Sequence, residues 1–239
     1  MSASFVHLHL HTEYSLVDST VRIARLMERC AADGMPAVAL TDQNNLFGMV
    51  KFYRKAIAAG VKPIIGADLR IANEDDTTRP WHLVVLCQNL AGYRNDHYDL
   101  AQSLLDGWQA VFGDRYYLEL IRTGRPGEED TVQASLTLAS DTRTPVVASN
   151  DVRFVDRDDY NAHEARVCIR NGRVLADPNR PKHYSDRQYL RSAEEMCELF
   201  SDIPEALENS VEIARRCNLQ IKLGHSVLPD FPVPPGMTE

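Results

Sequence analysis

Short apolar strands alternate with amphipathic helices through the first 150 residues, and this alternation limits the possible folds more than any other feature. Such spacing favours parallel β-α units, built into a barrel or an open wound sheet. A chain of 239 residues is long enough for one α/β barrel. The pattern predicts strands at 4–10, 36–41, 62–71, 81–87, 115–121 and 144–150, and helices at 20–33, 46–59, 99–112 and 128–141.

The last third of the chain departs from this alternation. Two stretches, 158–171 and 192–217, show helical periodicity, and a polar segment that contains prolines lies between them. The final residues, LPDFPVPPGMTE, are rich in proline and have the composition of a linker. We therefore expect a barrel at 1–157, a helical extension that completes or flanks it at 158–225, and a linker toward a further domain at 226–239.

The charge and the cysteine content argue against several classes of protein. A net charge of -8 disfavours a free-standing nucleic-acid-binding protein, so contact with DNA would need a local patch or a partner. The five cysteines form no CxxC pair, which argues against a disulfide framework and a thiolate zinc site. No apolar run is long enough to span a membrane and no signal peptide is visible, so we expect a cytoplasmic protein.

The opening stretch FVHLHLHTEYSLVDS suggests a metal site. His9 and His11 share one face of the expected strand because side chains alternate along a strand, and together they could bind one ion. Asp18, Asp68 and Asp151 could add oxygen ligands for zinc, manganese or iron. Histidines and carboxylates near strand ends also serve as hydrogen-bonded core groups or helix caps, so spacing alone leaves both interpretations open.

Several long motifs resemble those of one known family. They are FVHLHLHTEYSLVDS, MPAVALTDQNNLFGMVKFYRKA, GVKPIIGADLRI, YYLELIRTGRPGEED, PVVASNDVRF, DDYNAHEARVCIRNG and SAEEMCELFSDIPEALENSVEIARRCNLQIKLG. Through these motifs the chain resembles, nearly end to end, the N-terminal PHP (polymerase and histidinol phosphatase) domain of bacterial DNA polymerase III alpha subunits of the proteobacterial type. The resemblance implies an α/β fold, a distorted seven-stranded β/α barrel, with the polymerase region following the proline-rich end.

The resemblance also implies which metal ligands survive. Active PHP domains have a first-strand His-x-His and then an acidic or histidine ligand, and His9, His11 and Asp18 match these positions. The usual third-strand glutamate is Asp68, which is shorter by one methylene, and the aspartate of the last motif is Asp151. These five residues are the expected remains of the metal site.

Two ligand positions of the family are lost. The histidine of the second-strand motif is Gln43, and the last motif, Asn-Asp-x-His in active members, ends in Arg153. A guanidinium has no lone pair for a metal, so Arg153 cannot be a ligand. We expect Arg153 to lie in the former metal region and to pair with Asp151, and with Asp18 or Asp68; the alternative is that it points to solvent.

A further departure lies in the middle of the chain. The family normally carries a long segment, with a strand and further ligands, between a GYxNL motif and the helix before YYLEL. Here GYRN, at 92–95, runs almost directly into the helix expected at 99–112. A barrel shortened near 95–100 would lack one β-α unit and would be open or rearranged at that edge.

The leading functional interpretation is a non-catalytic PHP domain with a degenerate metal site and no cofactor. By resemblance, its partners are the polymerase core of the same chain and the proofreading exonuclease (epsilon) subunit. DNA would be contacted only indirectly, and no membrane partner is expected. The parent protein would be a DNA-directed DNA polymerase, a nucleotidyltransferase, whose catalytic aspartates we expect in the polymerase region that follows the proline-rich end.

Two other functions stay open. The first is a residual metal-dependent phosphoesterase or pyrophosphatase, in which zinc, manganese or magnesium would bind the five surviving ligands and activate a water. The second is an independent DNA-binding protein, which the acidic charge balance disfavours.

Overall fold

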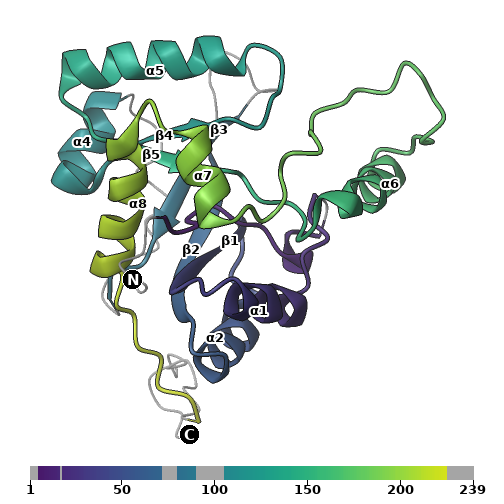
Figure 1. Ribbon diagram of the computed structural model, residues 1–239, viewed down its shortest axis with the longest axis horizontal. Coiled ribbons are helices and arrows are strands. Elements are labelled where there is room, and N and C mark those ends of the chain that lie inside the picture. Colours follow the sequence, from purple (N-terminus) through teal and green to yellow (C-terminus); the bar gives the residue numbers. More distant parts are fainter. Residues whose placement is uncertain (1–4, 17, 72–79, 90–104, 225–239) are drawn as a thin grey trace, which may run out of the picture.

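Two small β-sheets and the helices around them make up the fold (Figure 1). The computed structural model describes residues 5–16, 18–71, 80–89 and 105–224. The predicted linker at 226–239 and the shortened region near 95–100 lie outside these ranges. Among the helices described, none is both long and apolar enough to cross a membrane.

The first sheet has three strands in the order β1-β2-β3. Strand β1 (Ala37–Gln43) pairs in parallel with β2 (Lys62–Ile71), and this register sets Gln43 opposite Asp68. Strand β3 (Trp81–Leu86) pairs with β2 in the antiparallel direction, contrary to the predicted parallel units. The reason is the short connection between β2 and β3, since a parallel crossover needs a dozen or more residues.

The second sheet consists of β4 (Leu118–Ile121) and β5 (Val146–Ser149), which pair in parallel. The segment predicted as a strand at 4–10 forms only isolated bridges in the described residues, from His7 to Val38 and from Leu10 to Val152. These bridges still place the segment beside β1 and beside the residues that follow β5. The described part thus has five named strands in two sheets, and a seven-stranded barrel is not confirmed.

The helices largely follow the predicted ranges. They are α1 (Ile23–Ala32), α2 (Met49–Ala58), α4 (Leu105–Phe112), α5 (Glu128–Thr142), α6 (Tyr160–Arg170), α7 (Ala193–Leu199) and α8 (Pro204–Arg216), with short 3-10 helices at Glu13–Ser15, Gly113–Arg115 and Arg157–Asp159. Helices α1 and α2 lie side by side next to the first sheet, and α5 lies beside the second (Figure 1). Apolar residues on one face of α1, such as Leu26 and Met27, enter the core.

The helix predicted at 192–217 is two helices. Ser192 caps α7, because its side chain accepts a hydrogen bond from Glu195 N while the Glu195 carboxylate accepts one from Ser192 N. Pro204 then starts α8, where its fixed φ suits the first helical turn and its missing N–H costs nothing. A break between the two helices follows from these two signals.

Helices α7 and α8 share a core with the second sheet. Met196 and Phe200 pack in one cluster with Leu120 and Val146 of the two strands, and Phe5 of the first segment joins them. The helical part of the chain therefore packs on the second sheet. Figure 1 shows α8 running alongside β5, in agreement with their direct contact.

Candidate metal centre

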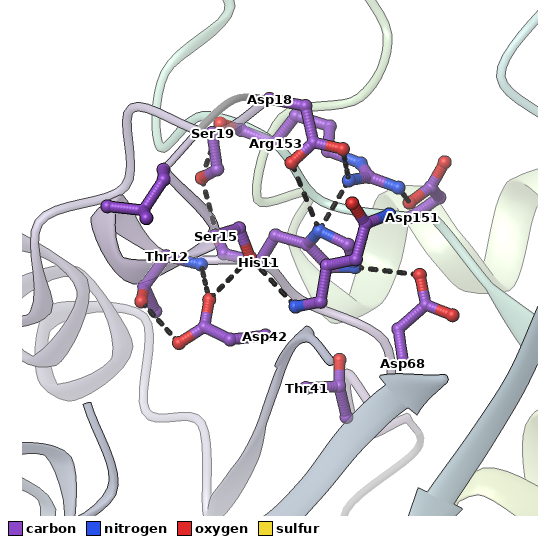
Figure 2. A network of polar contacts seen from close by, with 12 residues as sticks. His11, Thr12, Ser15, Asp18, Ser19, Thr41, Asp42, Asp68, Asp151 and Arg153 are labelled. Carbon is purple, nitrogen blue, oxygen red and sulfur yellow. Dashed lines mark hydrogen bonds and ion pairs between the residues drawn. The ribbon is translucent and has the colours of Figure 1, made fainter. Parts of the chain in front are cut away.

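Six side chains that were singled out in the sequence meet in one buried place. The first segment contributes two histidines, the loop after Glu13–Ser15 one aspartate, β2 another, and the turn after β5 the last two side chains. They belong to His9, His11, Asp18, Asp68, Asp151 and Arg153, and each of these residues as a whole is at most 5% exposed. Figure 2 shows five of these six side chains, with His11 between Asp18, Asp68 and Arg153.

The two imidazoles converge on one point. The Nε2 atoms of His9 and His11 lie 3.3 Å apart. Asp68 Oδ2 is 3.2 Å from His11 Nε2 and 3.8 Å from His9 Nε2, and Asp151 Oδ1 is 3.5 Å from His9 Nε2. Ligand atoms about 2.0–2.1 Å from a tetrahedral ion lie about 3.4 Å apart, so these spacings fit a single ion. His9, His11 and Asp151 form the group that could hold it.

Arg153 occupies the other side of the same site. Its Nη1 lies 2.6 Å from Asp18 Oδ2, and its Nη2 lies 2.5 Å from Asp151 Oδ1. Nη1 also contacts His11 Nδ1, and the guanidinium carbon lies 5.7 Å from the centre of the Tyr184 ring. The cation thus reaches two carboxylates predicted to be metal ligands, and it does not point to solvent.

The backbone conformation around Asp151 and the hydrogen bonds of its neighbours position the Asp151 and Arg153 side chains in the site. Asp151 adopts a left-handed conformation, with φ 44, which aspartate tolerates better than most residues. Gln188 donates a hydrogen bond to Asp151 Oδ2, and Asn150 donates two, to the carbonyls of Arg187 and Tyr189. These bonds hold the turn after β5 against the segment that follows α6.

The charges of the site compensate one another. Burial acts to raise the pKa of the Asp151 carboxyl, but the nearby positive charges, of which the Arg153 guanidinium contributes most, together outweigh it and lower this pKa to about 2. Burial also opposes ionisation of Asp18, and Arg153 again holds its pKa well below the usual range. For His9, burial acts to lower the pKa, but Glu119 and Asp151 raise it well above the ordinary value. Two cations therefore face the three buried aspartates.

Three further residues touch the site and were not predicted as part of it. Glu119 Oε1 lies 2.9 Å from His9 Nδ1, and His82 Nδ1 lies 3.1 Å from both oxygens of Asp68. Arg125 Nη1 lies 3.6 Å from Asp151 Oδ2. A carboxylate inside the apolar strand YYLELI was a visible signal for Glu119. His82 shows no ligand spacing in the sequence, and the pairing of β3 with β2 brings it to Asp68.

Other polar residues at the strand ends have structural roles. Asp42 accepts hydrogen bonds from Thr12 N at 2.6 Å, from the Thr12 hydroxyl at 2.7 Å and from the Ser15 hydroxyl at 2.7 Å (Figure 2). This carboxylate fastens the loop after the histidines to the end of β1. Gln43, at the lost ligand position, is half-buried. His7 donates to the carbonyl of Arg191 and packs edge-on against Phe5.

A cavity of about 320 Å³ lies beside the site. Its wall includes Glu119 and Arg125, the two residues that contact His9 and Asp151 from outside. Glu128 also lines it, so groups that enter this cavity would meet two carboxylates and one guanidinium. The one-ion ligand set therefore lies next to a charged cavity.

Residues 7–96 match the family model of the PHP domain. The chain is also related over nearly its whole length to bacterial DNA polymerase III alpha subunits. It is 46% identical to that of Pseudomonas fluorescens, over 100% of this chain and 24% of the relative. It is 44% identical to that of Escherichia coli K12, over 98% of this chain and 24% of the relative. These relatives confirm the resemblance inferred from the motifs.

The chain spans about a quarter of the length of these relatives. The match to the Pseudomonas fluorescens protein extends over 287 residues, although this chain has only 239, so the relative has residues without a counterpart in this chain. Among solved structures, a two-domain protein with a PHP-like metal-dependent phosphoesterase from Bacteroides vulgatus superposes with a TM-score of 0.41. That match has 10% identity and covers 89% of this chain and 69% of the other.

Proposed function

We propose that this chain is the PHP domain of a replicative DNA polymerase III alpha subunit, and that Arg153 serves there as a built-in cation in place of a metal. The domain would be a structural and docking module rather than a phosphoesterase. One observation carries this proposal: the Arg153 guanidinium lies within 2.6 Å of both Asp18 and Asp151, inside the set of expected ligands.

The physical reason is charge balance. Buried carboxylates without a counterion are costly, and a protein must either protonate them or supply a positive charge. A bound metal would supply this charge in an active PHP domain, whereas Arg153 supplies it permanently and cannot dissociate. The strand ends would then stay together whether or not metal is present.

Thermal unfolding with and without metal tests this role. We expect the unfolding midpoint to be the same in EDTA and in a small excess of Zn²⁺ or Mn²⁺, because a ligand that binds only the folded state would raise it. A midpoint that rises with metal concentration in the wild-type chain, but not in a His9→Ala variant, would contradict the proposal.

The partners in this proposal are the remaining polymerase region of a longer chain and a proofreading exonuclease subunit. The identity of 44–46% to proteins about four times longer supports the first of these. Analytical ultracentrifugation of the chain with a purified proofreading exonuclease tests the second. A complex of one copy each is the expected result, and two unchanged sedimentation boundaries at micromolar concentrations would contradict it.

A residual metal-dependent phosphoesterase is the second candidate, and the convergence of His9 Nε2 and His11 Nε2 favours it. His9, His11 and Asp151 would hold one ion, which would act as a Lewis acid and activate a water. This ligand group argues against the expectation that the domain has no cofactor at all.

A phosphoester or pyrophosphate assay with added Mn²⁺ separates the two candidates. Hydrolysis that disappears in a His9→Ala variant would favour the phosphoesterase. Hydrolysis absent from the wild type, or equal in both proteins, would favour the structural module. His183→Ala is the matched control, because this histidine is exposed and lies outside the site.

A further inference from the structure

A strongly basic stretch follows the start of α6. Between residues 165 and 187 there are six Lys or Arg residues and two Asp residues, although the whole chain has a net charge of -8. Within it, the loop at 171–183 has no named helix or strand, and it projects away from the body of the molecule beyond α6 (Figure 1). We call residues 170–183 the basic arm.

Ion pairs and hydrogen bonds fix the basic arm, both where it joins the rest of the chain and within the loop itself. Arg180 forms an ion pair with the buried carboxylate of Glu164, and Tyr184, just after the arm, donates a hydrogen bond to Asp18 Oδ2 at 3.3 Å. Within the arm, Asn179 N donates to Asp177 Oδ1 at 2.9 Å, and Arg173 N donates to the carbonyl of Cys168 at 2.9 Å. These bonds present the projecting side chains from a defined loop.

Several cations in this region serve no pairing inside the molecule. Arg170 and Lys182 are exposed, and so is Arg187 just beyond the arm. In the part of the chain that the structure describes, none of these three has a carboxylate partner. Arg173 is only loosely paired, at 3.6 Å from Asp177. The region thus keeps about three free positive charges on its surface.

We propose that the basic arm binds the phosphate backbone of duplex DNA. Phosphates are neutralised by Lys and Arg without regard to sequence, with release of counterions. A projecting loop lets an acidic protein contact DNA, because the repulsion between DNA and the acidic rest of the surface is screened over about 8 Å at physiological salt. Unpaired surface cations therefore meet DNA more favourably on the arm than on the body.

Exposed aliphatic side chains accompany these charges. Ile169 is 81% exposed, Val174 68% and Leu175 49%. Proteins that bind the minor groove place such side chains against bases next to their phosphate contacts. They would also suit an acidic protein surface, so the test must separate a nucleic acid from other polyanions.

Fluorescence anisotropy with a labelled duplex of about 20 base pairs tests the arm in the full 239-residue chain. Three neutralised phosphates predict that affinity falls about 40-fold between about 50 and about 200 mM KCl. An Arg170→Glu/Lys182→Glu variant should bind at least about tenfold more weakly at the lower salt. Arg54→Glu/Lys55→Glu on α2 is the matched control, since it removes two exposed cations that have no carboxylate partner among the described residues, and it should bind like the wild type.

Three results would overturn the proposal. They are no binding at about 50 mM salt, equal weakening in the arm variant and the control, and competition by polyglutamate that matches unlabelled duplex at equal charge. Circular dichroism of each variant checks its fold, and Arg170→Gln/Lys182→Gln replaces the arm variant if charge reversal disturbs it. A DNA contact on the arm goes beyond the proposed function and does not involve the buried site, so the metal experiments above succeed or fail separately.

Discussion

Arg153 Nη1 lies 2.6 Å from Asp18 Oδ2 although the two residues are 135 positions apart in the chain, and both side chains are only 6% exposed. The pair joins the loop after the first histidines to the turn after β5. A contact of this kind ties the two ends of the domain together at the point where a metal would otherwise do so. Most of the predictions below follow from it or from its surroundings.

Removing the guanidinium should destabilise the domain strongly. An Arg153→Met variant leaves Asp18 and Asp151 buried without their nearest counterion, and loss of one partner of a buried pair costs about 3–5 kcal/mol. Urea unfolding followed by circular dichroism measures the change. Arg157→Met is the control, because its pair with Asp186 is exposed and should contribute little to the stability. Equal losses in the two variants would show that Arg153 does not stabilise the site.

Replacing Arg153 with a metal ligand should create metal affinity. An Arg153→His variant removes the cation and adds an imidazole beside Asp18, Asp151 and His11, which together favour a divalent ion. Isothermal titration with Zn²⁺ should show binding and proton release, because ligands bind in their deprotonated forms. Arg153→Met should stay without such binding, and similar titration curves for both variants would contradict the prediction.

Lowering the pH should reduce the free energy of unfolding, because the buried His7 resists protonation in the folded state. Burial lowers the pKa of this histidine to about 4, against an ordinary value of 6.5, so the unfolded chain binds a proton more readily between these values. The stability that neutral His7 contributes is present above pH 6.5 and is lost as the pH falls toward about 4, by about 3 kcal/mol in all. The free energy of unfolding of a His7→Phe variant should therefore change less over this range. A wild-type slope retained in the variant would rule out His7 as the source.

The close approach of β2 and β3 should depend on a glycine. A Cβ at Gly66 would lie 2.3 Å from the carbonyl oxygen of Val85, nearer than any real contact, so Gly66→Ala must displace β3 from β2. Because β3 carries His82 to Asp68, this change should also loosen the wall of the site. Hydrogen exchange should show faster exchange at 81–86 in the variant. Unchanged protection there would contradict the packing described.

Much of the fold could be predicted from the sequence. Periodicity located β2 at its observed bounds and the helices to within a few residues, except where Pro204 divides the predicted C-terminal helix. The antiparallel direction of β3 depends on the length of one connection rather than on any pattern in the strand. The first segment pairs only at single bridges, one to Val38 of β1 and one to Val152 beyond the end of β5, and these depend on tertiary packing rather than on the strand pattern.

The candidate site, like the fold, could be predicted from the sequence only in part. Strand alternation placed His9 and His11 on one face, and the family motifs brought Asp18, Asp68 and Asp151 to them. Glu119, His82 and Arg125 were missed because each reaches the site through tertiary packing, from strands or turns whose own pattern shows no ligand spacing. Such neighbouring residues can be recognised only once the three-dimensional arrangement of the two sheets is known.

The metal content of the purified wild-type chain tests the central claim most directly. The protein would be expressed with zinc and manganese in the medium, isolated without chelator, and measured by inductively coupled plasma mass spectrometry beside the Arg153→His variant. If Arg153 replaces the metal, the wild type should contain far less than one ion per chain, and the variant should approach one. A full equivalent of zinc or manganese in the wild type would contradict the account.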